Sequence, residues 1–201
     1  MPPPLDFYFD FSSPYGYLAA QRIEALAARH ERSVDWHPIL LGAVFKQTGM
    51  VPLTEVPLKG DYSKRDFERS ARFHGISGFR RPSRFPISTL APARIVLWLK
   101  KENPALAVPA AKALYRAYFV EDIDISSPDS AVAVTAGVGI DPGAARAAID
   151  ESAVKDLLKR EVDEAIARGV FGSPFIFVDG EPFWGLDRFD QIDKWLATGG
   201  F

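Results

Sequence analysis

The apolar residues at the start of the chain alternate with more polar ones. This period of two predicts a β-strand over about Leu5–Phe11. From Ser13-Pro14 onwards the apolar residues recur with a helical period, which predicts a helix over about Pro14–Arg29. A second apolar segment predicts a strand near Val34–Leu40. Because a helix of this length separates the two strands, we expect a crossover connection and a parallel strand pair.

The middle of the chain has a mainly helical pattern. Residues 41–60 contain several Gly and Pro residues and are predicted to be irregular. From Asp61 to about Ala136 the pattern is helical, and Ser-Pro and Asp-Pro pairs mark two later helix starts. The predicted helices are Asp61–Phe73, Thr89–Lys101, Pro104–Phe119, a short helix from Pro128 to about Ala136, one that begins at Pro142, and an amphipathic helix with Val154 and Ile166 that ends at Gly169.

The pattern returns to β near the end of the chain. Phe175–Val178 and Glu181–Trp184 are predicted strands, joined by the hairpin signal Asp179-Gly180, and an amphipathic helix follows them. We therefore expect an α/β protein with one domain over residues 1–201. In it a helical insertion, about residues 61–150, separates a βαβ half from a ββα half of the same sheet.

Composition narrows the functional classes. The 201 residues are enough for one domain with a sizeable core, and the net charge of −2 comes from interspersed acids and bases. This charge distribution gives no indication of nucleic acid or a membrane surface as a partner. No apolar run approaches the ~20 residues of a transmembrane helix, and the N-terminus lacks the basic and apolar regions of a signal peptide.

The chain contains no cysteine, which excludes disulfides, cysteine nucleophiles and thiolate metal sites. Its three histidines lack the spacing of metal ligands, so we expect no metal site. Together with the absence of a signal peptide, these features favour a cytoplasmic location.

Ser13 is the first candidate for chemistry. It lies between the first strand and the first helix, where unpaired backbone N–H groups and the helix dipole favour negative charge. A hydroxyl at this place can act on an anion. It can also cap the helix, because Ser followed by Pro is a common helix start.

Two further candidate sites lie near the end of the chain. If the Ser173-Pro174 bond is cis, the backbone groups of Ser173 can pair with an extended, peptide-like ligand; otherwise Pro174 is an ordinary trans proline that starts an edge strand. The turn Gly185-Leu186-Asp187 could hold a carboxylate on its N–H groups and an ammonium group on Asp187. Alternatively, Asp187 is the N-cap of the last helix.

The order of these elements is typical of a thioredoxin-like fold. The tetrapeptide S-P-Y-G lies where disulfide oxidoreductases of the DsbA type carry C-P-x-C, with Ser13 and Gly16 at the two cysteine positions. A disulfide oxidoreductase is therefore excluded. Over essentially its whole length the chain resembles the 2-hydroxychromene-2-carboxylate isomerase and kappa-class glutathione transferase family. The segments that carry the resemblance are DFYFDFSSPYGYLA, KGDYSKRDFERSARFHGI, the Phe85-Pro86 pair, VFGSPFIFVDG and FWGLDRF.

The resemblance implies glutathione as cofactor. Ser13 and the helix dipole would stabilise the glutathione thiolate, which supplies the sulfur that the chain lacks. The backbone of Ser173, before a cis Pro174, would pair with the cysteinyl part of glutathione as an added strand does. The γ-glutamyl end would lie at the turn formed by Trp184, Gly185, Leu186 and Asp187.

The resemblance also implies a small aromatic substrate, covered by the helical insertion, and a homodimer. Lys46, Met50 and Thr89 fall at substrate-pocket positions, although the family usually has asparagine in place of Met50, and its isomerase has a tyrosine in place of Thr89. Three functions remain open: a glutathione-dependent cis–trans isomerase of an aromatic catabolite, a kappa-type transferase that conjugates electrophiles, and a non-catalytic peptide-binding protein. The family transferases join the same thiolate to an electrophile.

Overall fold

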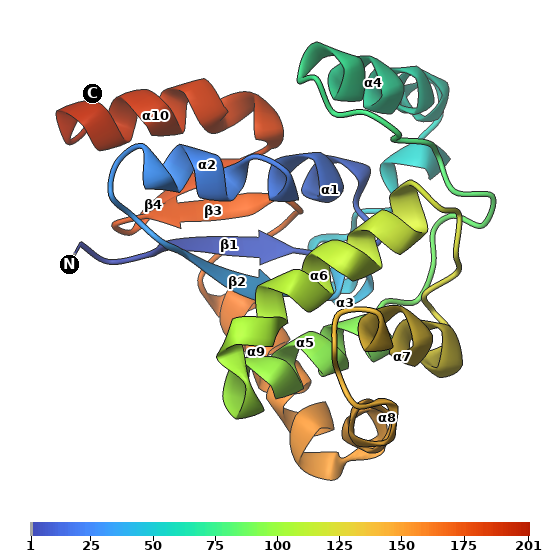
Figure 1. The fold of residues 1–201 in the computed structure, drawn as a ribbon. Coiled ribbons are helices and arrows are strands. Elements are labelled where there is room, and N and C mark those ends of the chain that lie inside the picture. The colour runs from blue at the N-terminus through green and yellow to red at the C-terminus, as the bar shows by residue number, and fades with distance from the viewer. Residues whose placement is uncertain (1) are drawn as a thin grey trace.

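A four-stranded sheet with the order β2-β1-β3-β4 forms the centre of the protein (Figure 1). The structure is a computed structural model that describes residues 2–201. β1 (Leu5–Phe9) pairs in parallel with β2 (Val34–Pro38), as predicted. β3 (Phe175–Val178) runs antiparallel both to β1 and to β4 (Glu181–Trp184). The sheet therefore brings the two ends of the chain side by side.

The two faces of the sheet are covered by different helices. Phe7 and Phe9 point to one face and pack with α1, α2, α6 and α10, whereas Tyr8 points to the other face and packs with α3 and α9. In Figure 1, α2 and α10 lie above the sheet and α9 lies below it. The alternating pattern of the first strand produces this division, because successive side chains of a strand point to opposite faces.

Most helices lie where the sequence predicts them. The bounds are α1 Pro14–Ala20, α2 Ile23–Ala28, α3 Leu41–Thr48, α4 Lys59–Phe73, α5 Leu90–Glu102, α6 Pro104–Phe119, α7 Pro128–Ala136, α8 Pro142–Asp150, α9 Ser152–Ala167 and α10 Phe189–Thr198, with 3-10 turns η1 at Leu53–Glu55 and η2 at Leu186–Arg188. The helices between β2 and β3 are α3 to α9. Among the described residues, no helix is long and apolar enough to cross a membrane.

Three predicted elements differ from the structure. The first strand ends at Phe9, because the chain turns at Asp10 towards α1. The predicted helix Pro14–Arg29 is two helices, since Arg22 leaves the helical conformation (φ −124°) and its side chain forms a hydrogen bond with His74, the C-cap residue of α4. The prediction that residues 41–60 are irregular is wrong for α3. The N-cap residue of that helix is Leu40, whose apolar side chain cannot accept a capping hydrogen bond.

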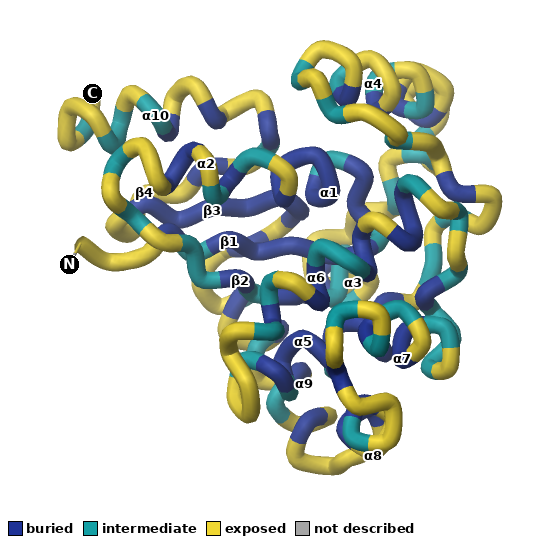
Figure 2. Tube along the Cα trace, viewed as in Figure 1, coloured by how far each residue is buried: buried dark blue, intermediate teal, exposed yellow. Residues whose placement is uncertain are grey.

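Burial follows the layers of the fold. Figure 2 shows most of β1 and all of β3 buried, whereas much of α4 is exposed. One cluster of buried residues connects the sheet with α1, α2, α5, α6, α7, α8 and α10. The sheet and most of the helices between β2 and β3 therefore share one core.

Candidate active site

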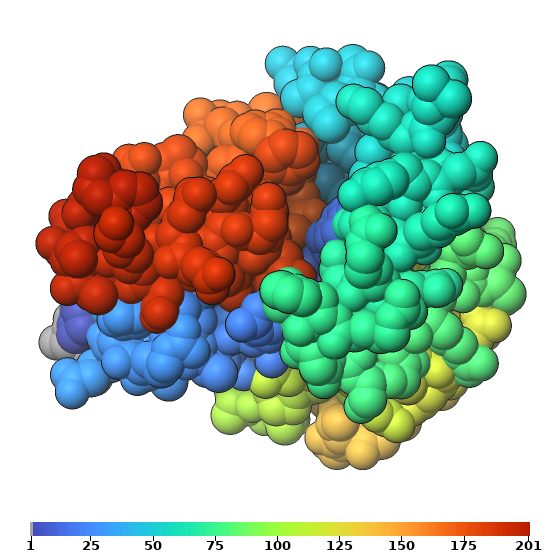
Figure 3. Space-filling model, turned by 90° about the horizontal axis from the view of Figure 1, so that it is seen from above, coloured from blue at the N-terminus to red at the C-terminus, as the bar shows by residue number. Residues whose placement is uncertain are grey.

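A cavity of about 960 Å³ opens where β1 ends and α1 begins. Figure 3 shows the hollow between the orange and red C-terminal segment and the teal α4, with the blue N-terminal segment at its base. Six stretches of chain contribute to its wall: residues 10–15, 40–59, 66–74, 85–90, and the segments 171–174 and 184–188 that flank the hairpin. All predicted site residues lie on this one cavity: Ser13, Lys46, Met50, Thr89, Ser173, Pro174, Trp184, Gly185, Leu186 and Asp187.

Ser13 is the N-cap of α1. Its Oγ accepts a hydrogen bond from the Gly16 N–H at 3.0 Å and donates one to the Ser173 carbonyl oxygen at 2.8 Å. The prediction that Ser13 caps the helix is confirmed. Ser13 also lines the cavity. A ligand that takes over the Ser173 carbonyl would free the Ser13 hydroxyl proton.

The Ser173-Pro174 peptide bond is cis, as the resemblance implies. The Ser173 Oγ accepts a hydrogen bond from the Asp10 N–H at 3.0 Å. A Cβ atom on Gly16 would lie 2.7 Å from this Oγ and 2.8 Å from the Tyr115 hydroxyl oxygen. Gly16 is therefore required here because Ser173 and Tyr115 already fill the space beside α1.

The turn after β4 forms one wall of the cavity. The Gly185 N–H donates to the Pro174 carbonyl oxygen at 3.1 Å, and the backbone of Gly185 has φ 108°, which favours glycine. Asp187 lies in η2 and its exposed carboxylate is 3.5 Å from the Arg188 guanidinium. The prediction that Asp187 caps α10 is wrong: the extra turn η2 makes Arg188 the N-cap, without a capping side chain.

Lys46, Met50 and Thr89 come from different segments. Lys46 lies in the last turn of α3 and Met50 follows the left-handed C-cap Gly49. Thr89 is the N-cap of α5 and is almost fully buried. The tertiary structure alone brings these three residues to one cavity, because no local pattern connects them.

Much of the cavity wall is apolar and exposed. A contiguous exposed apolar patch is typical of a surface that a ligand or partner covers. Trp184, with half of its surface exposed, packs edge-on against Phe171 at 4.9 Å between ring centroids. The exposed large hydrophobic residues of the cavity are Met50, Val51, Leu53, Leu90, Phe171 and Trp184. This wall is suited to an apolar ligand.

Comparisons with known proteins agree with this geometry. The model of the DSBA-like thioredoxin domain matches residues 4–197. The chain belongs to the DSBA-like thioredoxin domain family. It is 29% identical over 192 residues to the 2-hydroxychromene-2-carboxylate isomerase of Pseudomonas putida, covering 94% of this chain and 92% of that protein. It is 26% identical over 205 residues to glutathione S-transferase kappa 2 of Caenorhabditis elegans, covering 95% and 90%.

Solved structures give the same result. The structure of a 2-hydroxychromene-2-carboxylate isomerase superposes with a TM-score of 0.83 at 29% identity, covering 96% of this chain and 94% of that one. The predicted thioredoxin-like fold and the predicted resemblance are both confirmed. This member of the DSBA-like family carries Ser13 and Gly16 at the cysteine positions, so its cavity contains no thiol of its own.

Sequence reasoning missed Asp10 in this DSBA-like chain. The side chain is only 2% exposed, yet it lies on the cavity. Burial raises the pKa of Asp10 to about 6, although hydrogen bonds from Leu41, Ser12 and Thr89 oppose the shift. An acid at the end of an apolar strand, three residues before Ser13, was the available signal.

Proposed function

We propose that this protein binds glutathione in the cavity and is a cis–trans isomerase of a conjugated aromatic substrate of the 2-hydroxychromene-2-carboxylate type. One observation carries the proposal. A single cavity unites a serine hydroxyl at a helix N-terminus, a backbone carbonyl suited to a peptide-like ligand, and an apolar compartment. When bound, glutathione supplies a thiolate that adds reversibly to the substrate and is released again.

The residues of the cavity fit glutathione. The α1 N-terminus and the Ser13 hydroxyl would stabilise a thiolate and lower the pKa of the bound thiol. The buried Ser173 carbonyl, which now accepts from Ser13, would accept from the cysteinyl N–H of the ligand. The Ser13 hydroxyl would then donate its hydrogen bond to the glutathione sulfur instead of to the Ser173 carbonyl. Both the sulfur and the carbonyl oxygen would thus have a donor.

The turn after β4 would hold the γ-glutamyl end. Asp187 offers an exposed carboxylate for its ammonium group, while Gly185 and Leu186 contribute backbone. Trp184 and Pro174 form apolar surface beside them. Leu186 has a buried side chain, so any contact with the ligand comes from its backbone.

The second substrate would lie against the apolar wall. Met50 contributes exposed apolar surface there, Thr89 a hydroxyl at its edge, and Lys46 a positive charge for a carboxylate. The relatives that carry the name 2-hydroxychromene-2-carboxylate isomerase favour a carboxylated substrate. We also propose that the protein is a homodimer, as the family resemblance implies, and sedimentation velocity tests this. The absence of cysteine supports a cytoplasmic location, which cell fractionation tests.

A kappa-type glutathione transferase is the second candidate function. Met50 favours it, because an apolar side chain at the position of the family's asparagine suits a neutral electrophile. Product analysis separates the two functions. An isomerase returns free glutathione with the trans product, whereas a transferase consumes glutathione and forms a thioether.

Glutathione binding tests the proposal. Isothermal titration of the wild-type protein is expected to give affinity in the millimolar range or tighter. Ser13→Ala should weaken binding roughly tenfold or more, because a hydrogen bond to a charged group contributes about 1.5–3 kcal/mol. The control is Ser12→Ala, whose Oγ accepts from the Ile87 N–H instead. Wild-type protein that shows no glutathione binding at millimolar concentration would contradict both candidate functions and favour a peptide-binding role.

A further inference from the structure

The Asp10 carboxylate connects three segments of the cavity wall. Its Oδ1 accepts from the Ser12 N–H at 2.6 Å, just before α1. Its Oδ2 accepts from the Leu41 N–H at 2.7 Å, at the start of α3, and from the Thr89 hydroxyl at 3.3 Å, before α5. One buried side chain therefore fixes α3 and the start of α5 to the end of β1.

Asp10 acts as the missing cap of α3. The N-cap residue Leu40 makes no side-chain hydrogen bond, so the Leu41 N–H, one of the unpaired donors of a helix start, is satisfied by the Asp10 carboxylate. The charge also lies favourably at the positive end of the helix dipole. α3 carries Lys46 and leads to Met50, so its position sets the substrate side of the cavity.

Asp10 has no cationic partner. Within residues 2–201, burial and hydrogen bonds account for its pKa shift, and no lysine, arginine or histidine contributes to it. The titratable groups whose charge couples to Asp10 are Tyr115 and Tyr118 of α6. Burial raises the pKa of both phenols, so they stay neutral at physiological pH. The charge of Asp10 is thus stabilised by N–H and O–H donors alone, and its loss would release them.

We propose that Asp10 is a positioning residue whose negative charge fixes α3 and Thr89 at the Ser13 end of the cavity, so that protonation of Asp10 loosens the compartment of the second substrate. This proposal deepens the proposed function and rests on it for its effect on glutathione. Since Asp10 titrates at about pH 6, the change falls within the range in which enzymes work. A thiolate held by Ser13 adds a second negative charge near Asp10, so each group raises the pKa of the other.

Backbone amide NMR of the free protein tests the proposal without glutathione. In wild type, the amide protons of Ser12 and Leu41 should both shift with an apparent pKa near 6, and the α3 amides should lose protection from exchange below that pH. Asp10→Asn should abolish the titration and lower the α3 protection roughly tenfold at pH 7. Thr89→Val removes one donor to the carboxylate and should move the wild-type midpoint upwards. Asp66→Asn, a change to another acid on the cavity, should keep both the midpoint and the protection.

A second measurement links the charge to the ligand. In the glutathione complex, ultraviolet absorbance of the thiolate should give a lower thiol pKa for Asp10→Asn than for wild type. The proposal is overturned if the Leu41 amide does not titrate between pH 4 and 8, or if Asp10→Asn leaves the α3 protection and the bound thiol pKa unchanged. If neither wild type nor Asp10→Asn binds glutathione, the proposed function fails. The amide titration still decides whether the charge of Asp10 fixes α3 in place.

Discussion

At the scale of single residues, one glycine allows the exposed position of Trp184. A Cβ atom on Gly172 would lie 2.3 Å from the Trp184 Nε1, so any side chain at residue 172 forces the indole to move. The indole is half exposed and can swing into solvent without disturbing the core. The wall that Trp184 forms beside Asp187 therefore depends on Gly172.

Gly172→Ala is expected to weaken glutathione binding by roughly tenfold, about 1.4 kcal/mol, because the Trp184 wall is displaced. The free energy of unfolding should fall by less than about 1 kcal/mol. Isothermal titration and urea unfolding measure the two quantities. Gly143→Ala in α8, far along the chain from the cavity segments, is the matched control and should keep wild-type affinity. Equal affinities of Gly172→Ala and wild type would show that Trp184 does not contact the ligand.

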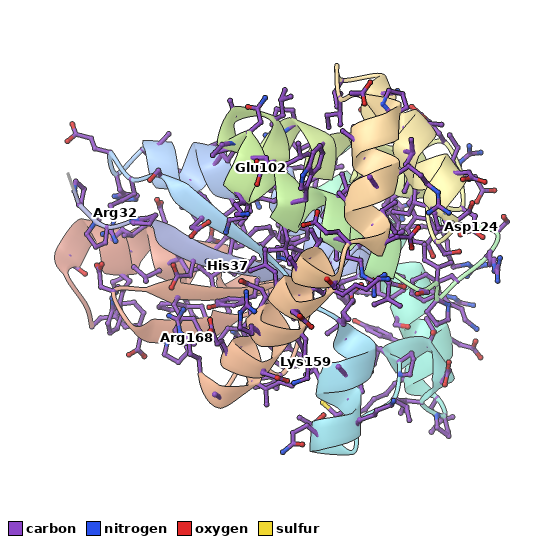
Figure 4. All side chains as sticks on the ribbon, turned by 90° about the horizontal axis from the view of Figure 1, so that it is seen from below. Arg32, His37, Glu102, Asp124, Lys159 and Arg168 are labelled. Carbon is purple, nitrogen blue, oxygen red and sulfur yellow. The ribbon has the colours of Figure 1, made fainter. Side chains whose placement is uncertain are left out.

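At the scale of elements, an ion network fastens α9 to the sheet. His37 of β2 lies 2.5 Å from the Glu161 carboxylate of α9 and 3.2 Å from Asp35, which also pairs with Lys100 of α5. Figure 4 shows His37 beside α9 on this side of the sheet. Burial lowers the pKa of His37, but the neighbouring Asp35 and Glu161 carboxylates outweigh it and raise the pKa above its usual 6.5.

This network predicts a pH dependence of stability. A raised pKa in the folded state means that charged His37 stabilises the fold fully below about pH 6.5, and that this contribution is lost as the pH rises through the folded pKa. Wild type should exceed His37→Gln in free energy of unfolding by roughly 1–3 kcal/mol at pH 6, and by less at pH 9. Urea unfolding at both pH values measures the difference. A constant difference between the two proteins would contradict the assignment.

At the scale of the whole molecule, the sheet and most of the helices between its two halves share one hydrophobic core. The cluster includes Phe7 of β1, Ile95 of α5, Leu114 of α6 and Ile192 of α10. The helical part also has a smaller cluster of its own, between α5 and α9. Continuous packing in the larger cluster nevertheless connects the helices to the sheet.

A shared core predicts cooperative unfolding. Far-ultraviolet circular dichroism reports mainly the helices. In a variant whose Trp98, Trp184 and Trp195 are replaced by phenylalanine, the fluorescence of the buried Trp36 reports the sheet. In urea the two signals should give one transition with the same midpoint. Two separated transitions would mean that the helices between β2 and β3 form a domain of their own.

The sequence by itself determined the elements with local signals. The alternation before Phe9 predicts β1, and the Ser-Pro and Asp-Pro starts predict α7 and α8, because a helix cap and a strand period involve only neighbouring residues. It also singled out Ser13, since a hydroxyl between a strand and a helix must face the helix N-terminus. The ten site residues named from the sequence all line one cavity, and most of them were identified through the family resemblance.

Only the tertiary structure decided the rest. α3 could not be read from its own residues, because its capping carboxylate comes from Asp10, 31 positions earlier. The break at Arg22 likewise carries no local signal of its own. The raised pKa of Asp10 exists only where the fold buries it away from any cation. Local chemistry therefore specified the elements, whereas long-range hydrogen bonds and burial specified the site.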